Sequence, residues 1–76
     1  MTREDWMQDF GENLLDILND RRIKQRVLSE MTGIATSTIS EYVNGRTMPS
    51  AEAIVKISYA LDVDYFDLLD FGDTID

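Results

Sequence analysis

The residues of this chain best suited to chemistry are short hydroxyl side chains gathered in one segment. Residues 31–50 read MTGIATSTISEYVNGRTMPS and contain a single acidic residue, Glu41, although the whole chain has a net charge of −8. Hydroxyl groups both donate and accept hydrogen bonds. A nearly acid-free segment in so acidic a protein indicates a surface that approaches a polyanion, because phosphate would repel carboxylates there.

The chain lacks the usual residues of catalytic and metal sites. It contains no cysteine and no histidine, which removes thiolate nucleophiles, the commonest general base and the commonest zinc ligands. The aspartates near the C-terminus lack the D-x-D-x-D-G spacing of a calcium loop. We therefore expect no enzyme activity, no metal and no cofactor.

Nothing in the sequence indicates a membrane. No apolar run approaches the roughly 20 residues that a spanning helix needs. The first residues, MTREDWMQDF, lack the apolar core of a signal peptide. We expect a cytoplasmic protein without a membrane partner.

Charge is distributed unevenly along the chain. Residues 1–20 contain one basic and six acidic residues, residues 21–50 five basic and two acidic, and residues 51–76 one basic and seven acidic. A basic middle between acidic flanks is compatible with nucleic-acid binding, which depends on neutralising phosphates. Two interpretations of the basic cluster remain open, surface charge that opposes the acidic first helix or phosphate contacts: Arg21, Arg22, Lys24 and Arg26.

Helical periodicity covers nearly the whole chain. The spacing of apolar residues predicts helices over residues 3–20, 25–32, 36–44, 51–60 and 64–70, before an acidic tail at 71–76. Thr2 with Asp5 has the pattern of a capping box, and Ser50 suits the N-cap of the fourth helix. No segment alternates with a period of two for long enough to predict a strand. The pattern predicts a single all-α domain of five helices over residues 1–76.

The second and third predicted helices are joined by a few residues around Gly33, which suits the left-handed conformation at a helix end. Helices joined in this way form a helix-turn-helix, whose second helix can enter the major groove of DNA. From the second helix, we expect Val27, Leu28 and Met31 to reach the core. From the third, polar side chains should face outward, where they can bond base edges or phosphates: Thr36, Ser37, Ser40 and Glu41.

The segment IKQRVLSEMTGIATSTISEYVNGRTMPS resembles the helix-turn-helix family of the phage repressors and Cro, the XRE-type regulators. Together with ALDVDYFDLL downstream, the resemblance covers about residues 10–70. It is carried by eleven matching positions: Gln25, Leu28, Ser29, Gly33, Ile34, Ile39, Asn44, Gly45, Arg46, Pro49 and Ser50. The resemblance implies a compact five-helix, repressor-like DNA-binding domain. It further implies a sequence-specific transcriptional regulator, repressor-like and of phage or mobile-element origin, with double-stranded DNA as its partner.

The resemblance also implies roles for single residues. The third helix would face the bases with Thr36, Ser37, Ser40 and Glu41. The phosphate backbone would be contacted by Gln25, Arg26, Thr38, Asn44 and Arg46. If Thr36 caps the third helix in place of Ala35, its hydroxyl is less free to reach a base.

The C-terminal segment VDYFDLLDF holds more apolar side chains than one short helix can easily bury in so small a domain. The family commonly dimerises through this end, so we expect a homodimer with an interface at Tyr65, Phe66, Leu69 and Phe71. One alternative function stays open. The helix-turn-helix would then be a protein-interaction module or antirepressor, whose acidic flanks bind a basic protein.

Overall fold

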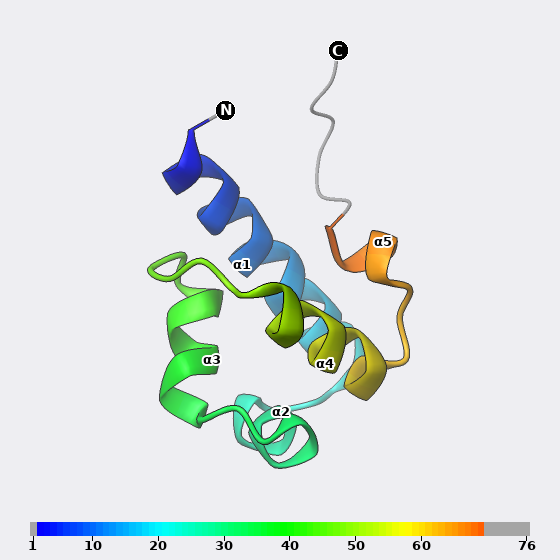
Figure 1. The fold of residues 1–76 in the computed structure, drawn as a ribbon. Helices are drawn as coiled ribbons and strands as arrows, with labels where there is room; N and C mark the ends of the chain where they lie inside the picture. Colours follow the sequence, from blue (N-terminus) through cyan, green and yellow to red (C-terminus); the bar gives the residue numbers. More distant parts are fainter. Residues whose placement is uncertain (1, 70–76) are drawn as a thin grey trace.

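The computed structural model describes residues 2–69, and within them it contains five helices and no strand (Figure 1). The predicted all-α class is therefore confirmed. The helices are α1 (Arg3–Arg21), α2 (Gln25–Thr32), α3 (Thr36–Val43), α4 (Ala51–Leu61) and α5 (Tyr65–Leu69). The predicted acidic tail and one predicted interface residue, Phe71, lie outside the described residues.

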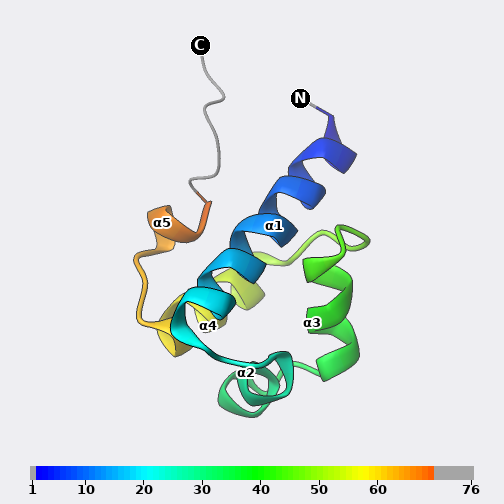
Figure 2. The same ribbon diagram turned by 180° about the vertical axis from the view of Figure 1, so that it is seen from behind.

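The helices form a small bundle in which α1 packs against α3 and α5, and α4 packs against α2 and α5. Helices α3 and α5 lie on opposite sides of the molecule (Figures 1 and 2). Helix α2 closes one end of the bundle and packs against α3 and α4. Within the described residues, no helix is long and apolar enough to cross a membrane.

Two predicted helix starts are confirmed by their caps. The hydroxyl of Thr2 accepts a hydrogen bond from the main-chain N–H of Asp5 at 3.1 Å, and the Asp5 carboxylate accepts one from the Thr2 N–H at 3.4 Å. This capping box satisfies N–H groups that the first turn of a helix leaves unpaired. Ser50 caps α4 by accepting from the N–H of Ala53 at 3.0 Å.

The core is a single apolar cluster that all five helices share. It consists of Phe10, Leu14, Leu18, Leu28, Ile39, Tyr42, Ala53, Ile54, Ile57, Leu61 and Leu68. The expectation for α2 was partly wrong, because Leu28 alone is buried there. Val27 is 37% exposed and Met31 50% exposed. Helix α2 buries one narrow face, and Val27 is turned about 100° away from Leu28 around the helix axis.

Side chains of α1 hold the C-terminal part of the chain in place. The Asn13 amide donates a hydrogen bond to the carbonyl oxygen of Leu68 at 2.6 Å, which ties α5 to α1. The Arg21 guanidinium donates to the carbonyl oxygen of Leu61, the last residue of α4. A cation at a helix C-terminus satisfies a free carbonyl and complements the helix dipole.

Candidate nucleic-acid interface

The turn between α2 and α3 is fixed by glycine and by two hydroxyl side chains. Gly33 ends α2 with a φ of 78°, where a residue with a Cβ would be strained. The Ser29 hydroxyl donates to the carbonyl oxygen of Ile34 at 2.5 Å. The Thr32 hydroxyl donates to the Leu28 carbonyl at 2.8 Å and accepts from the Ile34 N–H at 3.1 Å. These bonds pair the polar groups of the turn and fix the direction in which α3 leaves it.

Helix α3 has one buried face and one polar face. Ile39 and Tyr42 anchor it in the core. The predicted base-facing residues Thr36, Ser37 and Glu41 are exposed. The structure thus places most of the predicted polar face toward solvent, while Ser40 and the predicted phosphate contact Thr38 are half-buried.

Thr36 does not cap α3, which decides the alternative left open by the sequence. The N-cap is Ala35, which has no side-chain cap, and Thr36 is the first residue of the helix. The Thr36 hydroxyl is therefore not committed to capping its own helix. The start of α2 is similar, since its N-cap residue Lys24 makes no side-chain cap hydrogen bond. Main-chain N–H groups at such helix starts can bind an anion.

The end of α3 is held by hydrogen bonds to the loop that follows it. The Asn44 amide donates to the Ser40 carbonyl oxygen at 2.8 Å. The Glu41 Oε1 atom accepts from the Thr47 hydroxyl at 3.0 Å, and the Glu41 carbonyl accepts from the Arg46 N–H at 2.9 Å. Two predicted DNA contacts, Asn44 and Glu41, therefore already have partners within the chain. The role of Thr47 was missed, because its contact with Glu41 depends on the path of the loop.

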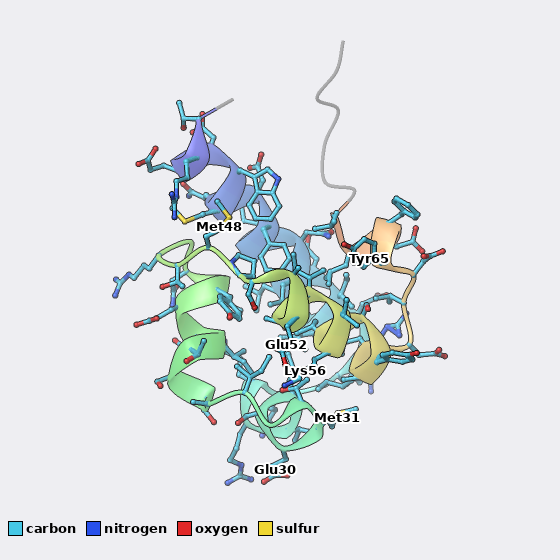
Figure 3. The ribbon with its side chains drawn as sticks, viewed as in Figure 1. Glu30, Met31, Met48, Glu52, Lys56 and Tyr65 are labelled. Atoms are coloured by element: carbon cyan, nitrogen blue, oxygen red, sulfur yellow. The ribbon has the colours of Figure 1, made fainter. Side chains whose placement is uncertain are left out.

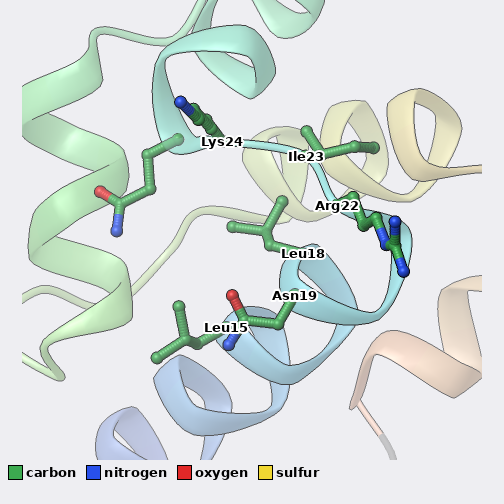
Figure 4. A pocket seen from close by; sticks show the side chains of 7 residues that line it. Leu15, Leu18, Asn19, Arg22, Ile23 and Lys24 are labelled. Atoms are coloured by element: carbon green, nitrogen blue, oxygen red, sulfur yellow. The ribbon is translucent and has the colours of Figure 1, made fainter.

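The start of α2 borders a groove of about 530 Å³ (Figure 4). Leu15 and Leu18 supply apolar surface from α1, and Ile23 and Lys24 come from the link between α1 and α2. Gln25, a predicted phosphate contact, also lines this groove and is half-buried. The groove thus joins the basic link to the first turn of α2.

Two exposed arginines, Arg26 on α2 and Arg46 after α3, form no ion pair within the described residues. Across residues 2–69 the structure contains one ion pair, between Lys56 Nζ and Glu52 Oε2 at 3.3 Å, on exposed α4 side chains (Figure 3). Arg26 and Arg46 are exposed and outside that pair. Both are available to an external anion, because an exposed guanidinium stays charged and carries up to five donors.

The buried position of Tyr42 in the last turn of α3 changes the pKa of its phenol. Burial raises the pKa of its phenol above the ordinary value of 10.0, and the neighbouring Glu41 carboxylate raises the pKa further. The Tyr42 ring meets that of Phe10 edge-on, with centroids 6.4 Å apart. Tyr42 therefore links α3 to α1 as a neutral, buried side chain.

The α4–α5 surface holds an exposed apolar patch, which we define as Val55, Tyr59, Tyr65 and Phe66. Tyr59 is 84% exposed and Phe66 73% exposed. The rings of Tyr65 and Phe66 meet edge-on, with centroids 5.7 Å apart. A hollow of about 360 Å³ between α4 and α5 is lined by Val55, Tyr59 and Tyr65 among others. Leu69, also predicted for the interface, is half-buried.

Val55 and Tyr59 were not foreseen as part of this patch. Their spacing of four residues on α4 was the available signal, because it places both on one face of a helix. That face differs from the one that buries Ile54 and Ile57.

A second surface feature is an acidic stripe on α1. Five acidic residues recur every three or four positions and so share one face of the helix: Asp5, Asp9, Glu12, Asp16 and Asp20. Gly11, which contacts α3, belongs to a different face. Within residues 2–69, no group of three or more acidic, histidine or cysteine side chains is arranged to hold a metal ion.

Comparison with known proteins gives a family and several similar folds. The helix-turn-helix family model HTH_3 matches residues 14–68. A search of curated proteins found no match. The restriction-modification controller protein C.AhdI from Aeromonas hydrophila has a TM-score of 0.80 at 24% identity, over 82% of this chain and 94% of its own.

Two further solved structures share the fold. The clp gene regulator ClgR from C. glutamicum has a TM-score of 0.79 at 25% identity, over 84% of this chain and 83% of its own. An HTH_3 family transcriptional regulator from Vibrio cholerae has a TM-score of 0.84 at 15% identity, over 88% of this chain and 38% of its own. Because the family model spans residues 14–68 of 76, the chain belongs to the HTH_3 helix-turn-helix family, which confirms the XRE-type resemblance and supports a DNA-binding transcriptional regulator.

Proposed function

We propose that this protein is a sequence-specific, repressor-like regulator that inserts α3 into the major groove of its DNA site. The supporting observation is the polar face of α3, which is exposed at Thr36 and Ser37, together with Arg26 on α2 and Arg46 after α3, which are exposed and form no ion pair with another residue of 2–69. Short hydroxyls can bond base edges, and a threonine methyl can pack on a thymine methyl. These two cations would neutralise phosphates of the DNA backbone.

The remaining predicted contacts fit this arrangement as positioning groups. Gln25 lies in the first turn of α2, where the helix dipole favours a phosphate. Thr38 and Ser40 are half-buried, and Asn44 is bonded to Ser40. We assign Gln25, Thr38 and Asn44 to the phosphate backbone, where contacts set register rather than sequence. Ser40 stays assigned to the base-facing side.

We further propose a symmetric homodimer formed through the α4–α5 patch. Exposed aromatic side chains of this size are typical of the centres of protein interfaces. A second copy supplies the same patch, as a two-fold interface requires. Such a dimer would present two copies of α3 to half-sites about 34 Å apart.

Selection of bound DNA from a random pool tests the function directly. We expect enrichment of a palindromic site, and an affinity for it that falls steeply as the salt concentration rises. Failure of the intact chain to bind any DNA at low salt would refute the regulator.

The acidic stripe on α1 supports a second candidate, an interaction module that binds a basic protein. If that candidate holds, a basic protein surface would bind the chain in a salt-sensitive manner. Replacing Asp9, Glu12 and Asp16 by the corresponding amides would then abolish the complex. In the regulator, the same changes would leave base preference unchanged, because the stripe lies on α1.

A further inference from the structure

We propose that Glu41 and Thr47 form a clamp that positions Arg46 for the DNA backbone, so that Glu41 is a positioning residue and not a reader of bases. The Glu41 carboxylate accepts from the Thr47 hydroxyl at 3.0 Å. The Glu41 carbonyl accepts from the N–H of Arg46 at 2.9 Å. Side chain and main chain of one residue therefore hold two consecutive residues of the loop after α3.

The clamp acts where the loop leaves the helix. Gly45 has a φ of 71°, and its N–H donates to the Tyr42 carbonyl oxygen at 3.1 Å, so the chain reverses immediately after α3. Thr47 is the first side chain beyond this reversal that bonds back to α3. The residues before and after Arg46, Gly45 and Thr47, are therefore both hydrogen-bonded to α3.

The ordered loop would favour the contact of Arg46 with a DNA phosphate. It is exposed, and it is the only basic residue between Arg26 and Lys56 in the sequence. Ordering a loop during binding costs affinity, and a loop that is ordered beforehand avoids most of that cost. The clamp would therefore strengthen a phosphate contact without altering which bases are read.

The charge of Glu41 also disfavours a base-reading role. It is the one acidic residue of α3, and a carboxylate close to DNA is repelled by the phosphates. A glutamate that reads sequence would accept from a base amino group, such as that of cytosine, whereas the Oε1 atom of Glu41 accepts from Thr47 and so directs the carboxylate toward the loop after α3. The negative charge repels DNA, but it also makes Glu41 a stronger acceptor for Thr47, since hydrogen bonds to charged groups are the stronger ones.

Because the clamp acts on DNA binding, it rests on the function proposed above. Four variants separate its parts, measured on the selected DNA site and on unrelated DNA. Thr47→Val removes the donor with little change in shape, and Thr47→Ser keeps the donor. Glu41→Gln keeps an acceptor oxygen without the charge, and Glu41→Ala removes both.

We expect Thr47→Val to weaken binding to both DNAs alike, by about threefold to tenfold, the effect of one hydrogen bond. Glu41→Ala should bind both DNAs more weakly than Glu41→Gln by a similar factor, because both variants lack the charge and only Glu41→Gln keeps an acceptor for Thr47. Thr47→Ser should bind like the unaltered protein. Glu41→Gln should keep the base preference and bind at least as tightly at low salt, because one repulsive charge is gone. In an Arg46→Ala background, Thr47→Val should have no further effect, since interacting residues are not additive.

Three results would overturn the clamp. A changed base preference in Glu41→Gln or Glu41→Ala would make Glu41 a base reader. An undiminished effect of Thr47→Val in the Arg46→Ala background would mean that Thr47 does not act through Arg46. Unchanged hydrogen exchange of the Arg46 amide in Thr47→Val, in the free protein, would refute the clamp alone. By contrast, absence of DNA binding by the unaltered chain would refute the proposed function, whatever the exchange result.

Discussion

Gly11 of α1 packs directly against the main-chain carbonyl group of Val43, the last residue of α3. A Cβ atom at Gly11 would overlap that carbonyl and the carbonyl oxygen of Tyr42. Main-chain atoms cannot move aside as the end of a flexible side chain can. Gly11 therefore sets how closely α3 approaches α1, and this distance determines how far the polar face of α3 lies from the core.

We predict that Gly11→Ala lowers the free energy of unfolding by about 2 kcal/mol or more, because overpacking forces the two helices apart. Helix propensity alone predicts the opposite, a gain of about 1 kcal/mol for alanine over glycine. Urea unfolding distinguishes the two. The neighbouring exposed variant Glu12→Ala is the control and should stay within about 0.5 kcal/mol of the unaltered protein. A Gly11→Ala variant as stable as the original would contradict the close contact.

The fold could be predicted from the sequence wherever local pattern and tertiary packing agree. Gly33 ends α2 as expected, and Leu28 and Ile39 enter the core at helical spacing. The buried face of the eight-residue helix α2 was harder to predict, because its short apolar pattern did not show which face packs against the core. Val27 and Met31 are exposed rather than buried in the core.

The site could be predicted less completely than the fold. The polar residues of α3 were identifiable because they lie between buried anchors of a periodic helix. The Glu41–Thr47 hydrogen bond joins residues on either side of a chain reversal, and the Gly11–Val43 contact joins two distant helices. Both depend on how the chain folds back on itself, which periodicity does not describe.

Because of Tyr42, the free energy of unfolding should depend on pH in the alkaline range. Burial, together with the Glu41 carboxylate, raises the pKa of the folded phenol above 10.0. The folded state then keeps the proton at pH values where the unfolded chain releases it. The stabilisation is complete below about pH 10 and is lost as the pH rises from there toward the folded pKa. We expect Tyr42→Phe to remove this part of the decline in unfolding free energy above pH 10. Tyr59→Phe, an exposed control, should retain the decline, and identical slopes for all three proteins would refute the role of Tyr42.

Ser37 and Arg46 should affect DNA binding in different ways. Ser37 is exposed in the first turn of α3, so Ser37→Ala should change the base preferred at one position of each half-site without measurable loss of stability. Arg46→Ala should weaken binding to all sequences and reduce the salt slope by about 1. Selection from a random pool and titrations at several salt concentrations measure both effects. Lys56→Ala on α4 is the control for the loss of a cation and should change neither. If Ser37→Ala left the preference untouched, the assigned orientation of α3 on DNA would be wrong.

The α4–α5 patch should govern the oligomeric state. Tyr59→Glu and Phe66→Glu each place a charge on an exposed apolar side chain of the patch, where a second copy would have to desolvate it. We expect both variants to sediment as folded monomers at concentrations at which the unaltered protein is a dimer. Leu15→Glu introduces the same charge at a half-exposed leucine of α1 and should leave the dimer intact.

Affinity for a full palindromic site should fall in the monomeric variants toward that for a single half-site, because the two α3 helices then bind independently. Sedimentation of the unaltered protein as a monomer at high micromolar concentration would exclude this interface.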